Sequence, residues 1–318
     1  MNKAAIQTST VTMTSVVTAE GNWNDRFASG AGASCSLVLV AISAVIPNRC
    51  DAHITAHAAA TTANRHRYVA AYGRFCVRQR GRRDEAVKVI GLLGGMSWES
   101  SIVYEQILNQ ETRRRLGGVH SADLLIRSYD FAAVERLQAA GEWEQAGRLL
   151  ADGARAFEAA GAELLVLCTN TMHEVADMIA AAVAIPFLHI ADVTAAAIKA
   201  AGLAEVGLLG TRYTMERDFY RGRLQTTHGL TVLVPDEPDR TLVHQIIYSE
   251  LVQGIIRHQS RTRYLEVIGR LQQRGAEGIV AGCTEIELLV QAGDLSLPYF
   301  PTTRLHALAA LDMALASS

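Results

Sequence analysis

The hydrophobic pattern of the chain changes at residue 87. From there on, short runs of apolar residues alternate with longer segments in which apolar residues recur every three or four positions. The short runs are typical of buried strands, and the longer amphipathic segments are typical of helices. This alternation predicts an α/β fold of parallel sheets with helices on both faces.

The apolar runs place four strands in each half of this region. The first four are expected at 89–93, 124–128, 164–167 and 187–190, and the second four at 206–209, 231–234, 278–281 and 299–300. Ser97 is suited to cap a helix that ends near Leu116, before two glycines. Further helical segments are expected across 131–160, from about 171 and over 193–201.

The two halves also repeat each other in sequence. VIGLLG at 89–94 matches VGLLG at 206–210, and GAELLVLCT at 161–169 matches GAEGIVAGCT at 275–284. The two matches have offsets of 116 and 115 residues. An internal repeat of this kind predicts two pseudosymmetric lobes, each with a parallel sheet flanked by helices. The predicted boundaries are 87–191 plus 303–318 for the first lobe and 192–302 for the second.

A Cys-Thr pair follows a strand at the same place in each repeat. Ligands of open parallel sheets bind beyond the carboxyl ends of the strands. Two lobes facing each other about a pseudo-twofold axis would therefore place Cys168 and Cys283 on opposite walls of one cleft. Taken alone, either cysteine is more typical of a small buried hydrophobic residue. The duplicated context favours a functional role for both.

Two thiols across a substrate suit a racemase, which removes a proton from one face of a carbon and returns one on the other. A helix N-terminus can lower a thiol pKa from its usual value of about 8.5, and both cysteines precede expected helix starts. The free backbone amides there, of Thr169, Asn170, Thr171 and the residues after Cys283, could receive a substrate carboxylate.

Composition narrows the function classes. The 318 residues are 49% apolar and carry a net charge of −2, which argues against a nucleic-acid binder. The longest apolar run, 35–47, is shorter than the ~20 residues of a spanning helix, so no membrane partner is expected. Five scattered cysteines are typical of free thiols in a reducing cytoplasm.

Residues 1–86 differ in character from the rest. They hold ten Lys/Arg and five Asp/Glu, whereas residues 87–318 hold twenty and twenty-seven. Weak periodicity and this change of charge sign predict a disordered or spurious N-terminal extension. A transit peptide and a nucleic-acid patch remain as alternatives.

Other kinds of site are poorly supported. The glycines at 91–95 lack dinucleotide and Walker spacing, and Ser97 lacks the last glycine of a nucleophile elbow. His53 and His57 have no carboxylate or cysteine at ligand spacing, so no metal site is expected. The chain has only three lysines, none well placed for pyridoxal phosphate. We therefore expect no cofactor.

Several motifs resemble the cofactor-independent aspartate/glutamate racemase family. They are GLLGGMSWES (91–100), LLIRSYDF (124–131), CTNTMH (168–173), PFLHIAD (186–192), LLGTRYTMERDFYRGRL (208–224) and GCTEIELLV (282–290). The resemblance covers about 87–318 and is strongest to the broad-specificity amino-acid racemase branch. Members of this family commonly begin just before a Lys-x-Ile-Gly-Leu-Leu-Gly stretch. This start suggests that translation begins at Val87.

The resemblance implies an enzyme that interconverts L- and D-amino acids without a cofactor, as a cytoplasmic homodimer with the site between its lobes. The family's catalytic cysteines match Cys168 and Cys283. Its substrate-binding positions match Met96, Gln138, Thr169, Asn170, Thr171 and Thr284. For an acidic substrate, Arg127 and Arg212 are candidates to bind the distal carboxylate.

Two other classes of function stay open. One is a sister activity on the same scaffold, namely maleate isomerase, malonate decarboxylase or hydantoin racemase. The other is a non-catalytic amino-acid-binding protein, against which the two retained thiols argue.

Overall fold

The computed structural model describes residues 87–316. The predicted N-terminal extension, 1–86, lies outside the described residues, and so do His53 and His57 within it. Val87, the proposed start of translation, is the first described residue. Among the described residues, no helix is long and apolar enough to cross a membrane.

The first sheet contains four parallel strands in the order β2-β1-β3-β4. They are β1 (Ile90–Gly94), β2 (Leu124–Ser128), β3 (Leu164–Leu167) and β4 (Phe187–Leu188). Its strands present alternate side chains to two apolar layers, because successive residues of a strand point to opposite faces. Leu93, Leu165 and Leu167 enter one cluster, and Ile90, Leu92 and Val166 enter the other.

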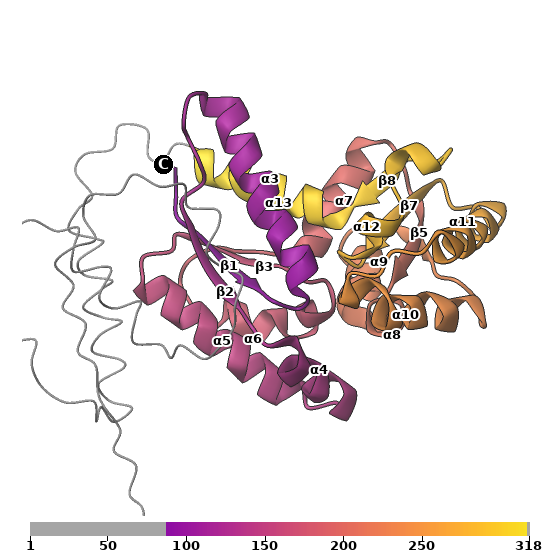
Figure 1. Ribbon diagram of the computed structural model, residues 1–318, viewed down its shortest axis with the longest axis horizontal. Helices are drawn as coiled ribbons and strands as arrows, with labels where there is room; N and C mark the ends of the chain where they lie inside the picture. Colours follow the sequence, from indigo (N-terminus) through magenta and orange to yellow (C-terminus); the bar gives the residue numbers. More distant parts are fainter. Residues whose placement is uncertain (1–86, 317–318) are drawn as a thin grey trace, which may run out of the picture. The chain divides into compact units, whose positions relative to one another are not determined.

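Helices cover both faces of this sheet. On one face lie α3 (Trp98–Leu116) and the C-terminal helix α13 (Thr302–Leu315), which share a core cluster with β1 and β3 (Figure 1). On the other lie α4 (Phe131–Ala140), α5 (Trp143–Ala159) and α6 (Ala176–Ala180). The end of the chain thus packs with its earliest described strand.

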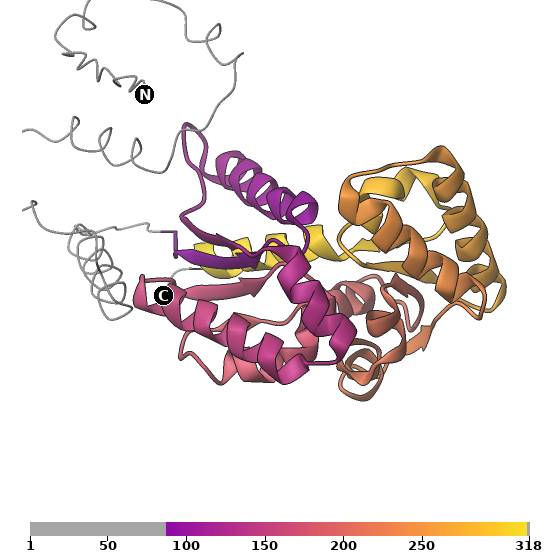
Figure 2. The same cartoon turned by 60° about the horizontal axis from the view of Figure 1, so that its bottom comes forward.

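The second sheet repeats this arrangement. Its parallel order is β6-β5-β7-β8, formed by β5 (Glu205–Gly210), β6 (Thr231–Leu233), β7 (Gly278–Gly282) and β8 (Tyr299–Pro301). One face packs on α10 (Asp239–Ser249), α11 (His258–Gln273) and α12 (Ile286–Leu289), and the other on α7 (Ile190–Ala200) and α9 (Arg223–Thr226). The figures show these helices around the second sheet (Figures 1 and 2).

The two sheet orders are the same once β1 to β4 are matched to β5 to β8. The repeated GLLG segments form the two central strands β1 and β5, and each repeated Cys-Thr pair follows the neighbouring strand, β3 or β7. The predicted α/β class with two pseudosymmetric lobes is therefore confirmed.

The predicted elements differ from the structure mainly in length. The strand expected at 187–190 stops at Leu188, because the His189 ring accepts a hydrogen bond from the Ala191 backbone amide and begins α7 at Ile190. The helical stretch at 131–160 is divided by Gly141, which adopts a left-handed conformation with φ 72°. The spacing of apolar residues does not reveal such single-residue caps and turns, so it predicts the ends of elements less well than their presence.

Candidate active site

Cys168 directly follows β3 and is fully buried. Its backbone amide donates to the Leu93 carbonyl of β1 at 2.9 Å, which continues the ladder by one residue beyond the strand. Burial alone raises the pKa of this thiol well above its usual value. The side chain therefore lies at the carboxyl edge of the first sheet as a neutral thiol.

The segment after Cys168 forms the 3-10 helix η1 (Thr171–Val175) instead of the expected α-helix. The reason is a side chain that competes for a backbone acceptor. The His173 ring Nδ1 donates to the Thr169 carbonyl at 2.7 Å, and the His173 amide bonds the Asn170 carbonyl. The Thr169 carbonyl is thus occupied by a ring where an α-helix would place the His173 amide.

His173 is part of a buried imidazole cluster. Its Nε2 accepts from the Ile190 amide at 3.2 Å, which assigns the proton to Nδ1. Its ring packs against those of His189 and His306, with centroids 4.6 and 5.9 Å away. Burial lowers the pKa of all three, to about 4 for His189 and His306. They are therefore neutral near pH 7 and support the Cys168 loop.

Cys283 follows β7 at the equivalent place and is also buried. Its Sγ donates to Oε2 of Glu285 at 2.8 Å, and the Thr284 hydroxyl donates to the same oxygen at 2.9 Å. Burial is the largest cause that raises the pKa of this thiol, and the Glu285 charge and hydrogen bond raise it further. We call each cysteine with the loop that follows it a half-site. In the second half-site, unlike the first, a carboxylate contacts the sulfur.

Glu285 also joins the two lobes. Its Oε1 accepts from the Ser97 hydroxyl at 2.6 Å and from the Ser97 amide at 3.4 Å. Ser97 stands at the start of α3, but its side chain caps no amide there, contrary to the predicted capping role. The hydroxyl is used for a contact with the other lobe.

Asn170 makes the reciprocal connection. Its Nδ2 donates to the Thr302 hydroxyl at 3.0 Å, and that hydroxyl donates to the Ala281 carbonyl of β7 at 2.7 Å. The Thr171 hydroxyl meets the Thr211 hydroxyl at 2.9 Å. The loop after Cys168 is thereby linked to the strand that carries Cys283. The buried Oδ1 of Asn170 has no protein partner.

Met96 and Gln138 approach this region from the first lobe. Gly95 positions Met96 with φ 85°, and a Cβ there would overlap the Tyr129 backbone, so glycine is required. Gln138 donates to the Met172 sulfur at 2.9 Å and accepts from the Tyr248 hydroxyl at 3.2 Å. Tyr248 belongs to α10, so this bond also crosses between lobes.

All eight predicted site residues are at most 7% exposed: Met96, Gln138, Cys168, Thr169, Asn170, Thr171, Cys283 and Thr284. All but Gln138 follow the carboxyl ends of β1, β3 or β7, and Gln138 reaches this region from α4 through its bond to Met172.

Arg127 and Arg212 are placed differently. Arg127 is exposed on β2, with its guanidinium 4.4 Å from the centre of the Tyr129 ring. Arg212 is exposed beside Thr241 and Glu216. No hydrogen bond of either residue reaches a predicted site residue within 87–316.

Four polar residues that the sequence did not indicate contact the predicted site residues or one another: Ser97, Tyr248, Glu285 and Thr302. Glu285 had a detectable signal, because it stands two residues after Cys283 as Asn170 does after Cys168. The other three carried none, since their contacts join residues more than a hundred positions apart.

The expectation of thiols with lowered pKa values is wrong for this structure. The helices after the cysteines are short, and burial raises the pKa of both thiols. Desolvation penalises the thiolate when no cation offsets it.

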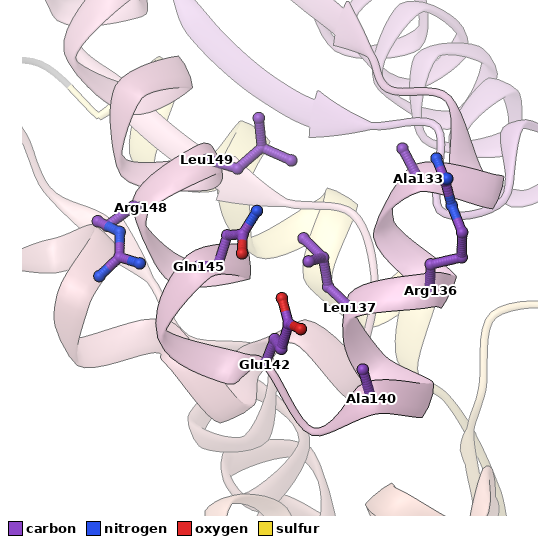
Figure 3. Close-up of a pocket in the computed structure, with 8 residues that line it drawn as sticks. All are labelled: Ala133, Arg136, Leu137, Ala140, Glu142, Gln145, Arg148 and Leu149. Atoms are coloured by element: carbon purple, nitrogen blue, oxygen red, sulfur yellow. The ribbon is translucent and has the colours of Figure 1, made fainter.

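A surface hollow of about 640 Å³ lies between α4 and α5 (Figure 3). Its lining includes Arg136, Leu137, Glu142 and Arg148, and none of the predicted site residues. Arg148 is already paired with Glu144 on its own helix at 2.5 Å. The hollow is therefore separate from the candidate site.

The sequence model of the Asp/Glu/Hydantoin racemase family matches residues 93–310. A crystal structure of a candidate Asp/Glu racemase from Yersinia pestis is similar, with 54% identity, a TM-score of 0.68 and coverage of 72% of this chain and 100% of that one. An aspartate racemase homologue from Pyrococcus horikoshii has 32% identity, a TM-score of 0.63 and coverages of 71% and 99%.

Two further similarities are more limited. The aspartate racemase of Picrophilus torridus shares the fold at 21% identity, with a TM-score of 0.60 and coverages of 71% and 94%. An uncharacterised protein encoded 3′ of pnlA in Pectobacterium carotovorum is 36% identical over 104 residues, which are 33% of this chain and 67% of that protein.

Proposed function

This chain belongs to the Asp/Glu/Hydantoin racemase family, and we propose that it is an amino-acid racemase that works without a cofactor. In this proposal Cys168 and Cys283 are the two acid-base groups that exchange the α-proton. The observation that carries the proposal is their equivalence: each follows the same strand of a repeated sheet, and side-chain bonds connect their loops.

The chemistry follows from the two half-sites. One cysteine, as thiolate, removes the α-proton and becomes a thiol, while the other thiol gives its proton to the opposite face and becomes the thiolate. The reverse reaction exchanges these roles, which is why a racemase needs two groups. The substrate ammonium supplies the positive charge that buried thiols need in order to ionise.

The polar residues around the cysteines have matching roles in this proposal. The Thr169 hydroxyl and the amides of Thr171 and Thr284 receive the α-carboxylate. The Thr169 amide, expected from the sequence to be free, donates to the Leu167 carbonyl at 2.9 Å, and the Thr284 hydroxyl is engaged by Glu285. The unpartnered Oδ1 of Asn170 is a suitable acceptor for the α-ammonium. Met96 and Gln138 contact the substrate side chain, and Gln138 gives up its bond to Tyr248 when the substrate enters.

We propose the broad-specificity branch of the family, with the enzyme acting as a cytoplasmic homodimer. The lobes are proposed to be 87–191 plus 303–318 and 192–302. The exposed, partnered positions of Arg127 and Arg212 do not favour them as ligands of a distal carboxylate. A neutral or flexible side chain therefore belongs in the substrate panel beside aspartate and glutamate.

The test is incubation with a panel of L-amino acids in D₂O, followed by chiral chromatography and by NMR of the α-position. We expect inversion together with α-deuteration, with no added cofactor. A hydantoin, maleate and a disubstituted malonate are incubated in parallel as substrates of the alternative activities. Turnover of one of those with no amino-acid inversion would contradict the proposal, as would activity that requires pyridoxal phosphate.

A further inference from the structure

The two cysteines occupy equivalent positions but have chemically different neighbours. At the 115-residue offset of the repeat, Asn170 corresponds to Glu285 and Met172 to Glu287. Asn170 and Glu285 each reach to the opposite lobe, to Thr302 and Ser97. The repeat therefore keeps the direction of the side chain and changes its charge.

Glu285 is held as an acceptor at every contact. The Ser97 hydroxyl and amide donate to Oε1, and the Cys283 thiol and Thr284 hydroxyl donate to Oε2. Four donors match the acceptor capacity of an ionised carboxylate, which has two oxygens and no proton to give. The side chain is only 2% exposed, so water screens its charge poorly.

Resting on the racemase proposed above, we propose that Glu285 is a positioning residue that keeps Cys283 protonated in the substrate-free enzyme. Its carboxylate accepts a hydrogen bond from the Cys283 thiol, and its negative charge disfavours a second negative charge on Sγ. Cys168 has no such partner among residues 87–316, so it ionises first. When the substrate ammonium brings its positive charge, Cys168 therefore becomes the base and Cys283 remains the acid.

The other titratable groups around the two sulfurs do not cancel this difference. Those facing Cys283 are Glu287 on its own segment, Tyr248 of α10, Tyr264 of α11 and Tyr299 of β8. Burial raises the pKa of each tyrosine, so these stay neutral. Cys168 faces Tyr104 of α3, whose pKa burial also raises. The Glu285 backbone acts in the opposite sense on Cys283, but less strongly than its carboxylate.

The experiment measures thiolate formation without substrate. Replacing Cys35, Cys50, Cys76 and Cys168 with Ser leaves Cys283 as the only thiol of the full chain, which is followed by ultraviolet absorbance against pH. In this background Glu285→Gln should lower the Cys283 pKa by about 1–3 units, because it removes a like charge at hydrogen-bond distance. Glu285→Asp, which keeps the charge, should restore most of the original pKa.

Two comparisons make the result specific. Glu287→Gln removes an equal charge that makes no bond to the sulfur, so its shift should be clearly smaller. A second background that retains only Cys168 should titrate at the same pH with and without Glu285→Gln. If Glu285→Gln leaves the Cys283 pKa unchanged or raises it, or moves both cysteines equally, the inference is overturned.

Ser97→Ala is a further variant, useful if Glu285→Gln does not fold. Without the Ser97 hydroxyl, the carboxylate has fewer donors and holds the thiol proton more tightly, so the Cys283 pKa should rise. A fall would overturn the inference. None of these titrations requires turnover, so their outcome stays separate from that of the racemase proposal.

In the active enzyme, the same effect appears in the pH dependence of kcat/KM. A mechanism with one thiolate and one thiol gives a bell-shaped profile, whose alkaline limb reports ionisation of the second thiol. Glu285→Gln should move that limb to lower pH. A purely structural role would reduce the rate and leave the limb where it was.

Discussion

The two half-sites share a backbone plan but differ in how each sulfur is surrounded. Cys168 and Cys283 follow equivalent strands, yet neutral imidazoles and an amide support the first, and the Glu285 carboxylate contacts the second. A duplicated fold thus fixes where the two cysteines lie. Single substitutions within the repeat then decide how each one holds its proton.

The central strands show the same divergence. GLLG is followed by Gly95 in the first lobe and by Thr211 in the second. Gly95 adopts φ 85° against the Tyr129 backbone, whereas Thr211 adopts φ −63° and caps α8 (Arg212–Glu216) by accepting from the Thr214 amide. Equivalent loops have therefore been adapted to a tight turn in one lobe and to a helix cap in the other.

The largest expected effect comes from removing either thiol. Cys168→Ser and Cys283→Ser should each lower racemisation by about 10²–10⁴-fold, because a serine hydroxyl is a far weaker acid. Each variant should still exchange the α-hydrogen of one enantiomer, and the two should prefer opposite enantiomers. NMR in D₂O measures this exchange.

The matched controls are Cys35→Ser, Cys50→Ser and Cys76→Ser, for which we expect unchanged activity. If both active-site variants exchanged the same enantiomer, the two cysteines could not act on opposite faces of the substrate. A near wild-type rate in either variant would be equally decisive.

The next largest effect concerns the residues after the two GLLG segments. Gly95→Ala should lower the free energy of unfolding by about 2–5 kcal/mol, since it combines a positive φ with overlap against backbone. Thr211→Gly should cost about 1–2 kcal/mol through the lost cap and hydroxyl contacts. Urea unfolding measures both.

Gly293→Ala is the control for this pair, because a Cβ there has open space and the glycine has no positive φ. Its unfolding free energy should stay within about 0.5 kcal/mol of wild type. Equal losses for Gly95→Ala and Thr211→Gly would remove the distinction between the two loops.

The second half-site also contains a carboxyl group with a raised pKa. Burial raises the pKa of Glu287 from 4.5 to about 7, so the folded state holds this proton more tightly than the unfolded state. The contribution of Glu287 to the free energy of unfolding therefore falls as pH rises from about 4.5 to 7 and is constant above that. Glu287→Gln removes this loss and keeps an oxygen that can accept from the Thr303 amide.

We expect Glu287→Gln to be more stable than wild type at pH 8 by up to about 3 kcal/mol, and the difference to vanish near pH 4. Thermal or urea unfolding across this range measures it. Glu266→Gln, at an exposed carboxylate of α11, should show no such trend. A gain that did not depend on pH would contradict the assignment to Glu287.

The smallest effect is expected at the rim between the lobes. Arg217 binds both carboxylate oxygens of Glu174 and lies 4.9 Å from the Trp143 ring. Because the Arg217 side chain is 42% exposed, so that water screens the pair, Arg217→Ala should cost only about 0–1 kcal/mol. Arg148→Ala, which breaks a pair within one helix, is the control; a loss above about 2 kcal/mol only at Arg217 would show a stronger link between the lobes.

The sequence by itself determined the α/β class, the two lobes and the positions of both cysteines. Apolar periodicity is a local property, so it predicted the strands from β1 to β8 to within a few residues. The internal repeat also predicted where the cysteines lie, because residues separated by the repeat offset occupy equivalent positions in the two sheets. Family resemblance then marked Asn170 and Thr284 as candidates to bind substrate.

Only the tertiary structure decided the environment of those residues. Glu285 meets Ser97 across 188 positions of sequence, and Gln138 meets Tyr248 across 110. No periodicity encodes such pairs, because they depend on how two separately folded sheets are joined. Burial in that junction also reversed the expected pKa shift of the thiols, since desolvation depends on surrounding atoms that are distant in the chain.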